Sequence, residues 1–302
     1  MRQKLSDQER NFDMSERETV TSRQNKAVVL VSKLDEKKYR DAEGMFRFDG
    51  IKLFSEACFC GLENQLVFIK ESSADKIIAR LSELGIEDLE AHTKRCIYIN
   101  DEIFNKISSE KSPEGIICAS NYIDKFHKII KINKRGIFYD GENEPQIYRG
   151  EKLIMLESIR DPGNLGTIIR GAYALGIDRI LLSGDCADIY NSKTVRAAMG
   201  SLFRMKIDRL HRDCALSDAI NALRSSGRRV LATALDKNAL PFENVDLRSD
   251  DVVVIGNEGH GLSPESINAC DRSVYIPMTE GAESLNAAMA ATVFIWELGK
   301  RK

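Results

Sequence analysis

The stretch VVVIGNEGHGLSPE, from Val252 to Glu265, predicts a strand, a glycine-rich loop and the start of a helix. Ser263 suits the N-cap of that helix and Pro264 its first position. This layout is common at phosphate and nucleotide sites. However, Glu258 lies where a phosphate would need backbone N–H groups or a lysine. The loop therefore favours a ligand that needs close backbone approach and a carboxylate, such as a cation, an amine or a hydroxyl.

The glycines of this loop match neither common nucleotide signature. Gly256, Gly259 and Gly261 lack the G-x-G-x-x-G order, and no G-x-x-x-x-G-K-[ST] occurs in the chain. A dinucleotide-dependent α/β enzyme stays open as an alternative, which calorimetry with NAD would test.

Apolar runs alternate regularly with helical patterns through the second half of the chain. The expected strands lie in LIMLES, RILLSG, LFRMKI, RRVLATAL, DVVVIG and SVYIPM, and the expected helices in NLGTIIRGAYALG, SKTVRAAMGS, LSDAINALRSSG and SLNAAMAATVFIWELGK. Strands without clean alternation are buried on both faces, so we expect an α/β fold with a parallel sheet covered by helices. Ligands of such sheets bind beyond the carboxyl ends of the strands, here the loops after Leu156, Gly256 and Met278.

The first half predicts a smaller α/β domain. Its expected strands are MFRFDG, LVFIKES and EGIICAS, and its expected helices are IKLFSEACFCG and ADKIIARLSELG. The polar stretch DGENEPQIYRGE is the best boundary. We therefore expect a charged, flexible arm over 1–25, a first domain over 26–145, and a second domain over 150–302 that is self-contained. A partner-ordered polar helix is the alternative for the arm.

Length and charge limit the possible classes of protein. A chain of 302 residues suggests about two domains. The net charge of −2 excludes a strongly basic protein, so any nucleic-acid surface must be local. KFHKIIKINKR spaces Lys125, Lys128, Lys131 and Lys134 three residues apart, followed by Arg135. This pattern indicates either a stripe that faces phosphates or a solvated face.

Cysteine usage and hydropathy indicate a cytoplasmic protein without metal or membrane. None of the seven cysteines forms a CxxC pair, and the four histidines are isolated, which argues against a zinc site. An odd number of cysteines without an apolar leader favours a reduced compartment. No apolar run is long enough to span a bilayer.

Polar residues in the first and third loops remain to be explained. We expect Asn164 to begin a helix on which Arg170 lies away from the apolar face, as a phosphate clamp or a plain surface cation. In the third loop Ser284 can cap the last helix, which leaves Asn286 without a structural reason.

Three stretches together resemble a known family. DPGNLGTIIRGAYALG, VVVIGNEGHGLSPE and VYIPMTEGAESLNAAMA are similar, in order and spacing, to the three motifs of the SpoU (TrmH) RNA 2′-O-ribose methyltransferases of the SPOUT superfamily. This resemblance extends from about Leu153 to the C-terminus. The first half resembles, more weakly, the ribosomal-protein-like RNA-binding domain often fused ahead of such enzymes.

The resemblance implies a fold, a cofactor and an assembly. The fold would be a SPOUT domain with a deep trefoil knot, working as a homodimer through the C-terminal domain. The cofactor would be S-adenosylmethionine, whose sulfonium is a cation of the kind that the glycine loop and its carboxylate favour. Its binding residues would be Thr233, Ala234, Gly256, Asn257, Gly259, Ile276, Met278 and Leu285.

The resemblance also implies catalytic positions and a substrate. Asn164, Arg170, Glu258, Ser284 and Asn286 match the polar positions of the motifs. Arg170 would either activate the ribose 2′-hydroxyl or, since guanidinium stays protonated, bind a phosphate and stabilise the developing alkoxide. RNA is the expected partner, with ribosomal RNA preferred over transfer RNA. An RNA-binding protein of this fold without catalysis is the remaining alternative.

Overall fold

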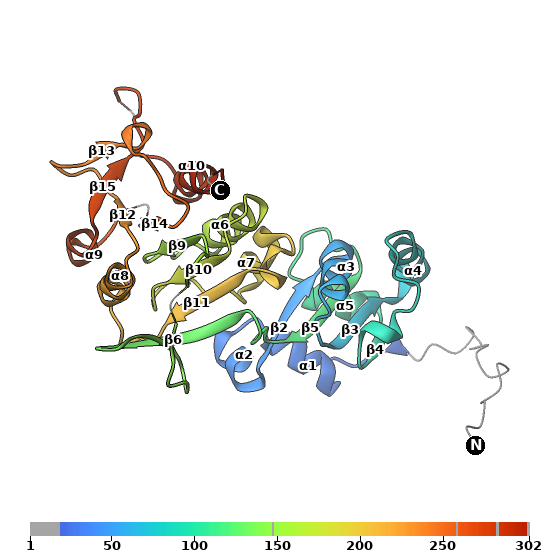
Figure 1. Cartoon of the computed structure of the whole chain (residues 1–302). Coiled ribbons are helices and arrows are strands. Elements are labelled where there is room, and N and C mark those ends of the chain that lie inside the picture. Colours follow the sequence, from blue (N-terminus) through green and yellow to red (C-terminus); the bar gives the residue numbers. More distant parts are fainter. Residues whose placement is uncertain (1–18, 147, 258, 282–283, 301–302) are drawn as a thin grey trace, which may run out of the picture.

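The structure is a computed structural model, and it describes residues 19–146, 148–257, 259–281 and 284–300. Two sheets build it, each with its own helices (Figure 1). We call the part around the smaller sheet the first domain and the part around the larger sheet the second domain.

The first domain is a five-stranded mixed sheet in the order β1-β4-β3-β5-β2. Its strands are β1 (Thr19–Val20), β2 (Met45–Asp49), β3 (Asn64–Lys70), β4 (Cys96–Ile99) and β5 (Ile116–Asn121), and its helices are α1 (Lys26–Lys33), α2 (Lys37–Glu43), α3 (Ile51–Phe59), α4 (Ala74–Glu83) and α5 (Asp101–Ile107). The α/β pattern expected from the apolar runs is present. Of the expected arm, residues 1–18 lie outside the described residues. Residues 19–20 form β1, which pairs with β4.

The second domain is a ten-stranded sheet in the order β13-β15-β12-β14-β9-β10-β11-β6-β7-β8. Its strands are β6 (His127–Asn133), β7 (Gly136–Tyr139), β8 (Pro145–Gln146), β9 (Leu153–Leu156), β10 (Arg179–Leu182), β11 (Lys206–Leu210), β12 (Val230–Thr233), β13 (Leu240–Pro241), β14 (Val252–Ile255) and β15 (Arg272–Tyr275). All pairs from β13 to β6 are parallel, as the unbroken apolar runs predict.

Helices cover both faces of this sheet. They are α6 (Pro162–Ala174), α7 (Ser192–Ala198), α8 (Leu216–Ser225), α9 (Pro264–Ala269) and α10 (Ala287–Gly299). Alternate residues of β9 point to opposite faces: Ile154 and Leu156 pack in the core with α6, α7 and α10, whereas Leu153 and Met155 pack in the core with α8 and α9.

The domain boundary differs from the expected one. The strands β6, β7 and β8 precede residue 150 in the chain, yet they belong to the larger sheet, where β6 pairs with β11. A fragment that starts at Arg149 would therefore leave an edge of β11 unpaired. This pairing argues against the expectation that such a fragment is self-contained.

The lysines of KFHKIIKINKR do not form one stripe. The segment is the strand β6 and not a helix, so side chains three residues apart, such as Lys128 and Lys131, point to opposite faces. Lys131 pairs with Asp140 at 2.8 Å.

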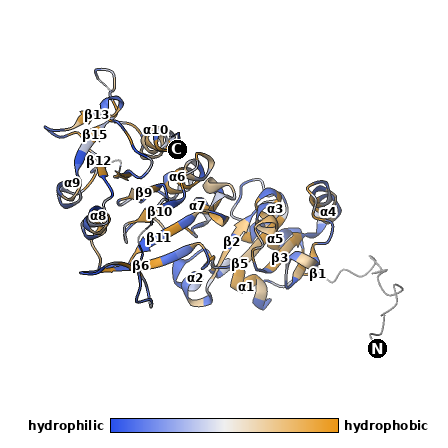
Figure 2. Ribbon diagram, viewed as in Figure 1, coloured by the Kyte–Doolittle hydropathy of each residue, from blue (hydrophilic) through white to orange (hydrophobic). Residues whose placement is uncertain are grey.

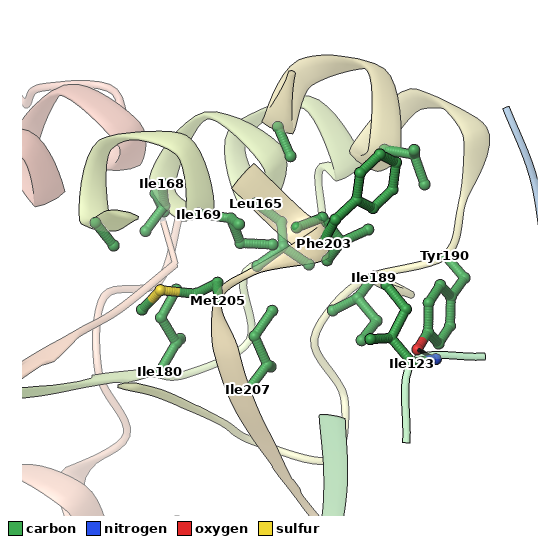
Figure 3. Close-up of a cluster of buried hydrophobic side chains, with 14 of the residues drawn as sticks. Ile123, Leu165, Ile168, Ile169, Ile180, Ile189, Tyr190, Phe203, Met205 and Ile207 are labelled. Atoms are coloured by element: carbon green, nitrogen blue, oxygen red, sulfur yellow. Dashed lines mark hydrogen bonds between the residues drawn. The ribbon is translucent and has the colours of Figure 1, made fainter. Parts of the chain in front are cut away.

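The two domains share one hydrophobic core. Residues of β2 and α3 belong to the same buried cluster as those of α6 and α7, and much of the α3 ribbon has the colour of hydrophobic residues (Figure 2). Tyr190 lies at the junction, with its ring stacked on Tyr122 at 4.1 Å. Its hydroxyl accepts a hydrogen bond from the Ile123 N–H at 2.7 Å (Figure 3). The first domain is thus packed onto the second and not merely tethered.

Candidate active site

The loop after β9 brings a capped helix to the carboxyl edge of the sheet. Asp161 is the N-cap of α6, and its Oδ1 accepts from the Asn164 N–H at 2.8 Å. Pro162 occupies the first turn, where its missing N–H costs nothing. Helix α6 therefore begins at Pro162, not at Asn164 as expected. The Lys193 ammonium and the Asn164 N–H keep the pKa of Asp161 below its usual value, so the cap is ionised at neutral pH.

The glycine loop is fixed to the loop after β9. Asn257 and Gly261 exchange backbone hydrogen bonds of 3.1 and 2.9 Å, which close the loop on itself. The Asn257 amide also donates to the Ser158 carbonyl at 2.9 Å. Ser158 has a φ of 55°, a left-handed conformation that non-glycine residues rarely adopt.

Glu157 is a second connection between these loops. Its carboxylate accepts from the Ser263 N–H at 3.0 Å and from the Ser263 hydroxyl at 2.8 Å. It also accepts from the Ser266 hydroxyl at 2.9 Å. Glu157 thereby occupies the amino end of α9 beside the crevice between β9 and β14, where a doubly wound sheet would place a nucleotide phosphate. This arrangement disfavours the dinucleotide alternative.

Gly256 is required by the packing of the glycine loop against its own backbone. A Cβ at this position would lie 2.4 Å from the Gly261 carbonyl carbon and 2.6 Å from the Leu262 nitrogen. The glycine therefore permits the loop to close on itself, before any ligand is considered.

The third loop ends in Asn286, which caps α10. Its Oδ1 accepts from the N–H groups of Ala288 at 2.9 Å and Met289 at 3.4 Å. Ser284 is not the cap, contrary to the expectation, because the helix begins two residues later than that expectation needs. The Asn286 Nδ2 also donates to Asn164 Oδ1 at 3.0 Å, which joins the first and third loops.

Arg170 lies on the solvent side of α6. Its neighbours Ile168 and Ile169 are fully buried, whereas Arg170 is exposed. Its guanidinium makes no hydrogen bond or ion pair with the part of the chain that the structure describes. Arg170 therefore keeps its donors free for an anionic group. Glu258 lies outside the described residues.

Seven of the eight expected cofactor residues line a single cavity of about 260 Å³; only Gly259 does not. The cavity opens where β12, β14 and β15 end. The expected residues that line it are Thr233, Ala234, Gly256, Asn257, Ile276, Met278 and Leu285, and Ser284 lines it too.

The lining of this cavity fits a nucleoside with a sulfonium group better than a polyphosphate. No lysine, arginine or histidine is among the lining residues that the structure describes. A pyrophosphate would therefore lack a counter-charge, whereas an adenosine and a methionine chain can use apolar walls and backbone groups. S-adenosylmethionine would be held by these residues.

Several residues of this site were not expected from the sequence, and Leu235, Phe294 and Glu157 are among them. Leu235 and Phe294 line the cavity, and Leu235 is 80% exposed at its mouth. A large apolar residue that directly follows a strand end is a signal that could have identified Leu235. Glu157 was missed as well, although a carboxylate directly after the buried run 153–156 was visible in the sequence.

In the described ranges, no three His, Cys, Asp or Glu side chains gather as a metal site would need. In the same ranges, no helix combines the length and apolarity needed to cross a bilayer.

Comparison with known proteins gives a consistent result. Residues 151–296 match the SpoU rRNA Methylase family, and residues 25–118 match the MRM3-like substrate binding domain. The chain is 28% identical over 280 residues to 23S rRNA (guanosine(2553)-2′-O)-methyltransferase RlmP of Bacillus subtilis, covering 92% of this chain and 98% of that protein. It is 26% identical to the mitochondrial rRNA methyltransferase 3 of Homo sapiens, covering 87% of this chain and 69% of that protein.

A solved structure is similar over nearly the whole length. The AdoMet-bound rRNA methyltransferase from Sinorhizobium meliloti is 29% identical, with a TM-score of 0.71, and the match covers 93% of this chain and 97% of that one. Both domains and the loops of the cavity thus fall within matched regions. The chain thus carries a methylase domain of the SpoU rRNA methylase family, with an MRM3-like substrate-binding domain ahead of it.

Proposed function

We propose that this chain transfers the methyl group of S-adenosylmethionine to a ribose 2′-hydroxyl of ribosomal RNA. The observation that carries the proposal is the junction of the three loops. The cavity that suits the cofactor lies beside the Asn164–Asn286 pair, and Arg170 is on the same helix as Asn164. The names of the relatives support ribosomal RNA over transfer RNA.

The residues of the chain mainly position the reacting groups. When bound, S-adenosylmethionine supplies an electrophilic methyl group on a cationic sulfur. Asn164 and Asn286 orient the attacking ribose beside the cavity, which supports an in-line approach. Arg170 binds the neighbouring phosphate and stabilises the negative charge that develops on the 2′-oxygen. A guanidinium is already protonated and cannot accept the proton of the 2′-hydroxyl, so this proton leaves to water or to another group.

The first domain selects and holds the RNA. The range 25–118 matches a substrate-binding domain, and its packing against the second domain supports a fixed distance between RNA contacts and the cavity. The ring contacts of Tyr190 with Phe46 and Tyr122 of the first domain support this fixed distance.

A homodimer through the second domain follows from one exposed apolar face. Met289, Val293 and Trp296 recur on one side of α10, with exposures of 61%, 39% and 52%. Tyr173 on the neighbouring helix α6 is 44% exposed. Four large apolar side chains on adjacent helices favour a subunit interface. The trefoil knot implied by the resemblance stays a prediction.

The proposed site of action is the cytoplasm. Seven free cysteines, of which Cys58, Cys118 and Cys186 are buried, suit a reducing compartment.

The function is tested by mapping 2′-O-methylated positions in ribosomal RNA from cells with and without this chain. Loss of one or a few positions supports the proposal. An unchanged rRNA map with a lost tRNA position would point to transfer RNA, and no change in either would point to binding without catalysis.

A further inference from the structure

A polar cleft of about 760 Å³ opens beside α8, away from the cofactor cavity. Its walls are the turn between β6 and β7, the edge strand β8 and the side of α8. It extends along α8 from Asp218 to Ser226, which corresponds to about 12 Å of helix. A strand of stacked nucleotides, which rises about 3.4 Å per nucleotide along its helix axis, could place several phosphates along it.

The turn between β6 and β7 carries two cations into this cleft. Asn133 and Gly136 pair across the hairpin, and the Asn133 Oδ1 accepts from the Arg135 N–H at 2.8 Å. This geometry exposes Lys134 and Arg135 at the tip. Arg149, also exposed, reaches the cleft from the segment that follows β8.

These three cations have no ion-pair partner in the part of the chain that the structure describes. Lys134, Arg135 and Arg149 make no ion pair with any carboxylate in the described ranges, in contrast to Lys131, which pairs with Asp140. Asp218 is the one acidic residue among the described residues of the cleft lining. The cleft therefore has an excess of positive charge in a chain whose net charge is −2.

One end of the cleft lies at the same edge of the sheet as the active site. Strand β6 runs parallel to β11 and pairs with it up to Ile130 and Leu210, and then continues to Asn133. Its carboxyl end, which leads into Lys134 and Arg135, thus projects beyond the edge at which the loops after β9 and β14 lie.

Arg149 marks the other end of the cleft. It lies toward the amino edge of the sheet, because Arg228, which precedes β12, donates to the carbonyls of Tyr148 and Glu151. An RNA strand that leaves the active site would meet Lys134 and Arg135 first and would reach Arg149 by following the cleft along α8.

We propose that this cleft binds the phosphate backbone of the RNA substrate, so that the second domain holds RNA in addition to the first. The proposal rests on the proposed function, because that function supplies the RNA. The contact is sequence-independent, since point charges on flexible side chains recognise phosphates and not base edges.

The test compares two double variants that remove the same charge. Arg135→Ala with Arg149→Ala removes two cations of the cleft. Arg248→Ala with Arg272→Ala removes two exposed arginines that precede β14 and begin β15 and are not among the residues that line the cleft. Affinity of the full chain for a ribosomal RNA fragment is measured by filter binding at several salt concentrations.

The cleft variant should bind more weakly, and its slope of log Kd against log salt should fall by about 1.5, because each lost phosphate contact removes about 0.7 to 0.9. The control variant should keep the wild-type slope. Replacing both cleft arginines by lysine should restore most of the slope, since lysine preserves the charge. Cofactor affinity and the melting temperature, measured on every variant, show whether each is folded.

Equal slopes for the cleft variant and the control would overturn the proposal, and so would a lysine variant that behaves like alanine. Either result with a wild-type chain that methylates ribosomal RNA leaves the proposed function intact. A wild-type chain that neither binds nor methylates ribosomal RNA would instead overturn the proposed function itself.

Discussion

The Asn286 side chain donates a hydrogen bond to the Asn164 side chain across 3.0 Å, and it joins two helices whose first turns are 122 positions apart in the chain. The same Asn286 oxygen caps α10. One amide thus fixes the start of the last helix and the orientation of a second amide beside the cofactor cavity.

Replacing Asn286 separates these two roles. Asn286→Ala should lower the free energy of unfolding by about 1 kcal/mol, because the cap is lost, and should also lower methyl transfer. Asn286→Asp keeps a capping oxygen but loses the amide donor. It should retain stability and still lose activity, as measured by thermal unfolding and a methyl-transfer assay. Equal activity of the Asp variant and the wild type would show that the contact with Asn164 is not needed.

Gly256 and Gly259 form a matched pair of substitutions. Gly256→Ala places a Cβ 2.4 Å from backbone of Gly261, so the loop must open and cofactor affinity should fall by at least tenfold. At Gly259 the nearest contact of a Cβ would be Asn257 Oδ1 at 3.4 Å, so Gly259→Ala should change affinity little. Calorimetry with S-adenosylmethionine distinguishes the two. Comparable losses in both variants would contradict the internal-packing explanation.

The sequence pattern predicted the helices and strands better than it predicted the helix caps and the pairing of strands between segments. The parallel strands and the helix on Leu165, Ile168 and Ile169 follow from apolar spacing alone. The cap at Asn286 was not predicted, because Ser284 is an equally good capping residue by type. The assignment of β6 to the larger sheet was not predicted either, since pairing with β11 depends on tertiary contacts. The cofactor positions came from the resemblance and not from residue spacing.

His127 gives the domain junction a dependence on pH. Although the residue is only half-buried, both ring nitrogens face protein partners, the Tyr190 hydroxyl at 2.6 Å and the Leu202 carbonyl at 3.1 Å. Desolvation lowers the pKa of His127 from 6.5 to about 4. The unfolded chain therefore binds the proton more readily between pH 4 and 6.5, and stability falls as the pH decreases through that window.

The loss should be at most about 3 kcal/mol across the window. It is measured by denaturant unfolding at pH 7, 5.5 and 4.5. His127→Gln cannot titrate, so its stability should fall less over the same range. Parallel pH profiles for the variant and the wild type would contradict this role of His127.

Trp296 tests the proposed subunit interface. Trp296→Asp places a charge on the exposed apolar face of α10 and should convert a dimer into a monomer, as seen by light scattering. Phe59 on α3 is 61% exposed and lies in the first domain, so Phe59→Asp is the matched control and should leave the dimer intact. A Trp296→Asp chain that stays dimeric would place the interface elsewhere.

The most direct test of the central claim is methyl transfer in vitro. Purified full-length chain is incubated with unmodified ribosomal RNA and methyl-labelled S-adenosylmethionine, and the RNA is then digested to nucleosides. We expect label in a 2′-O-methylated nucleoside. The guanidinium of Arg170 is exposed and is not among the described groups that line the cofactor cavity. Arg170→Ala should therefore abolish the label while cofactor affinity stays within a few-fold. Label on a base, or no label from a wild-type chain that binds the cofactor, would contradict the central claim.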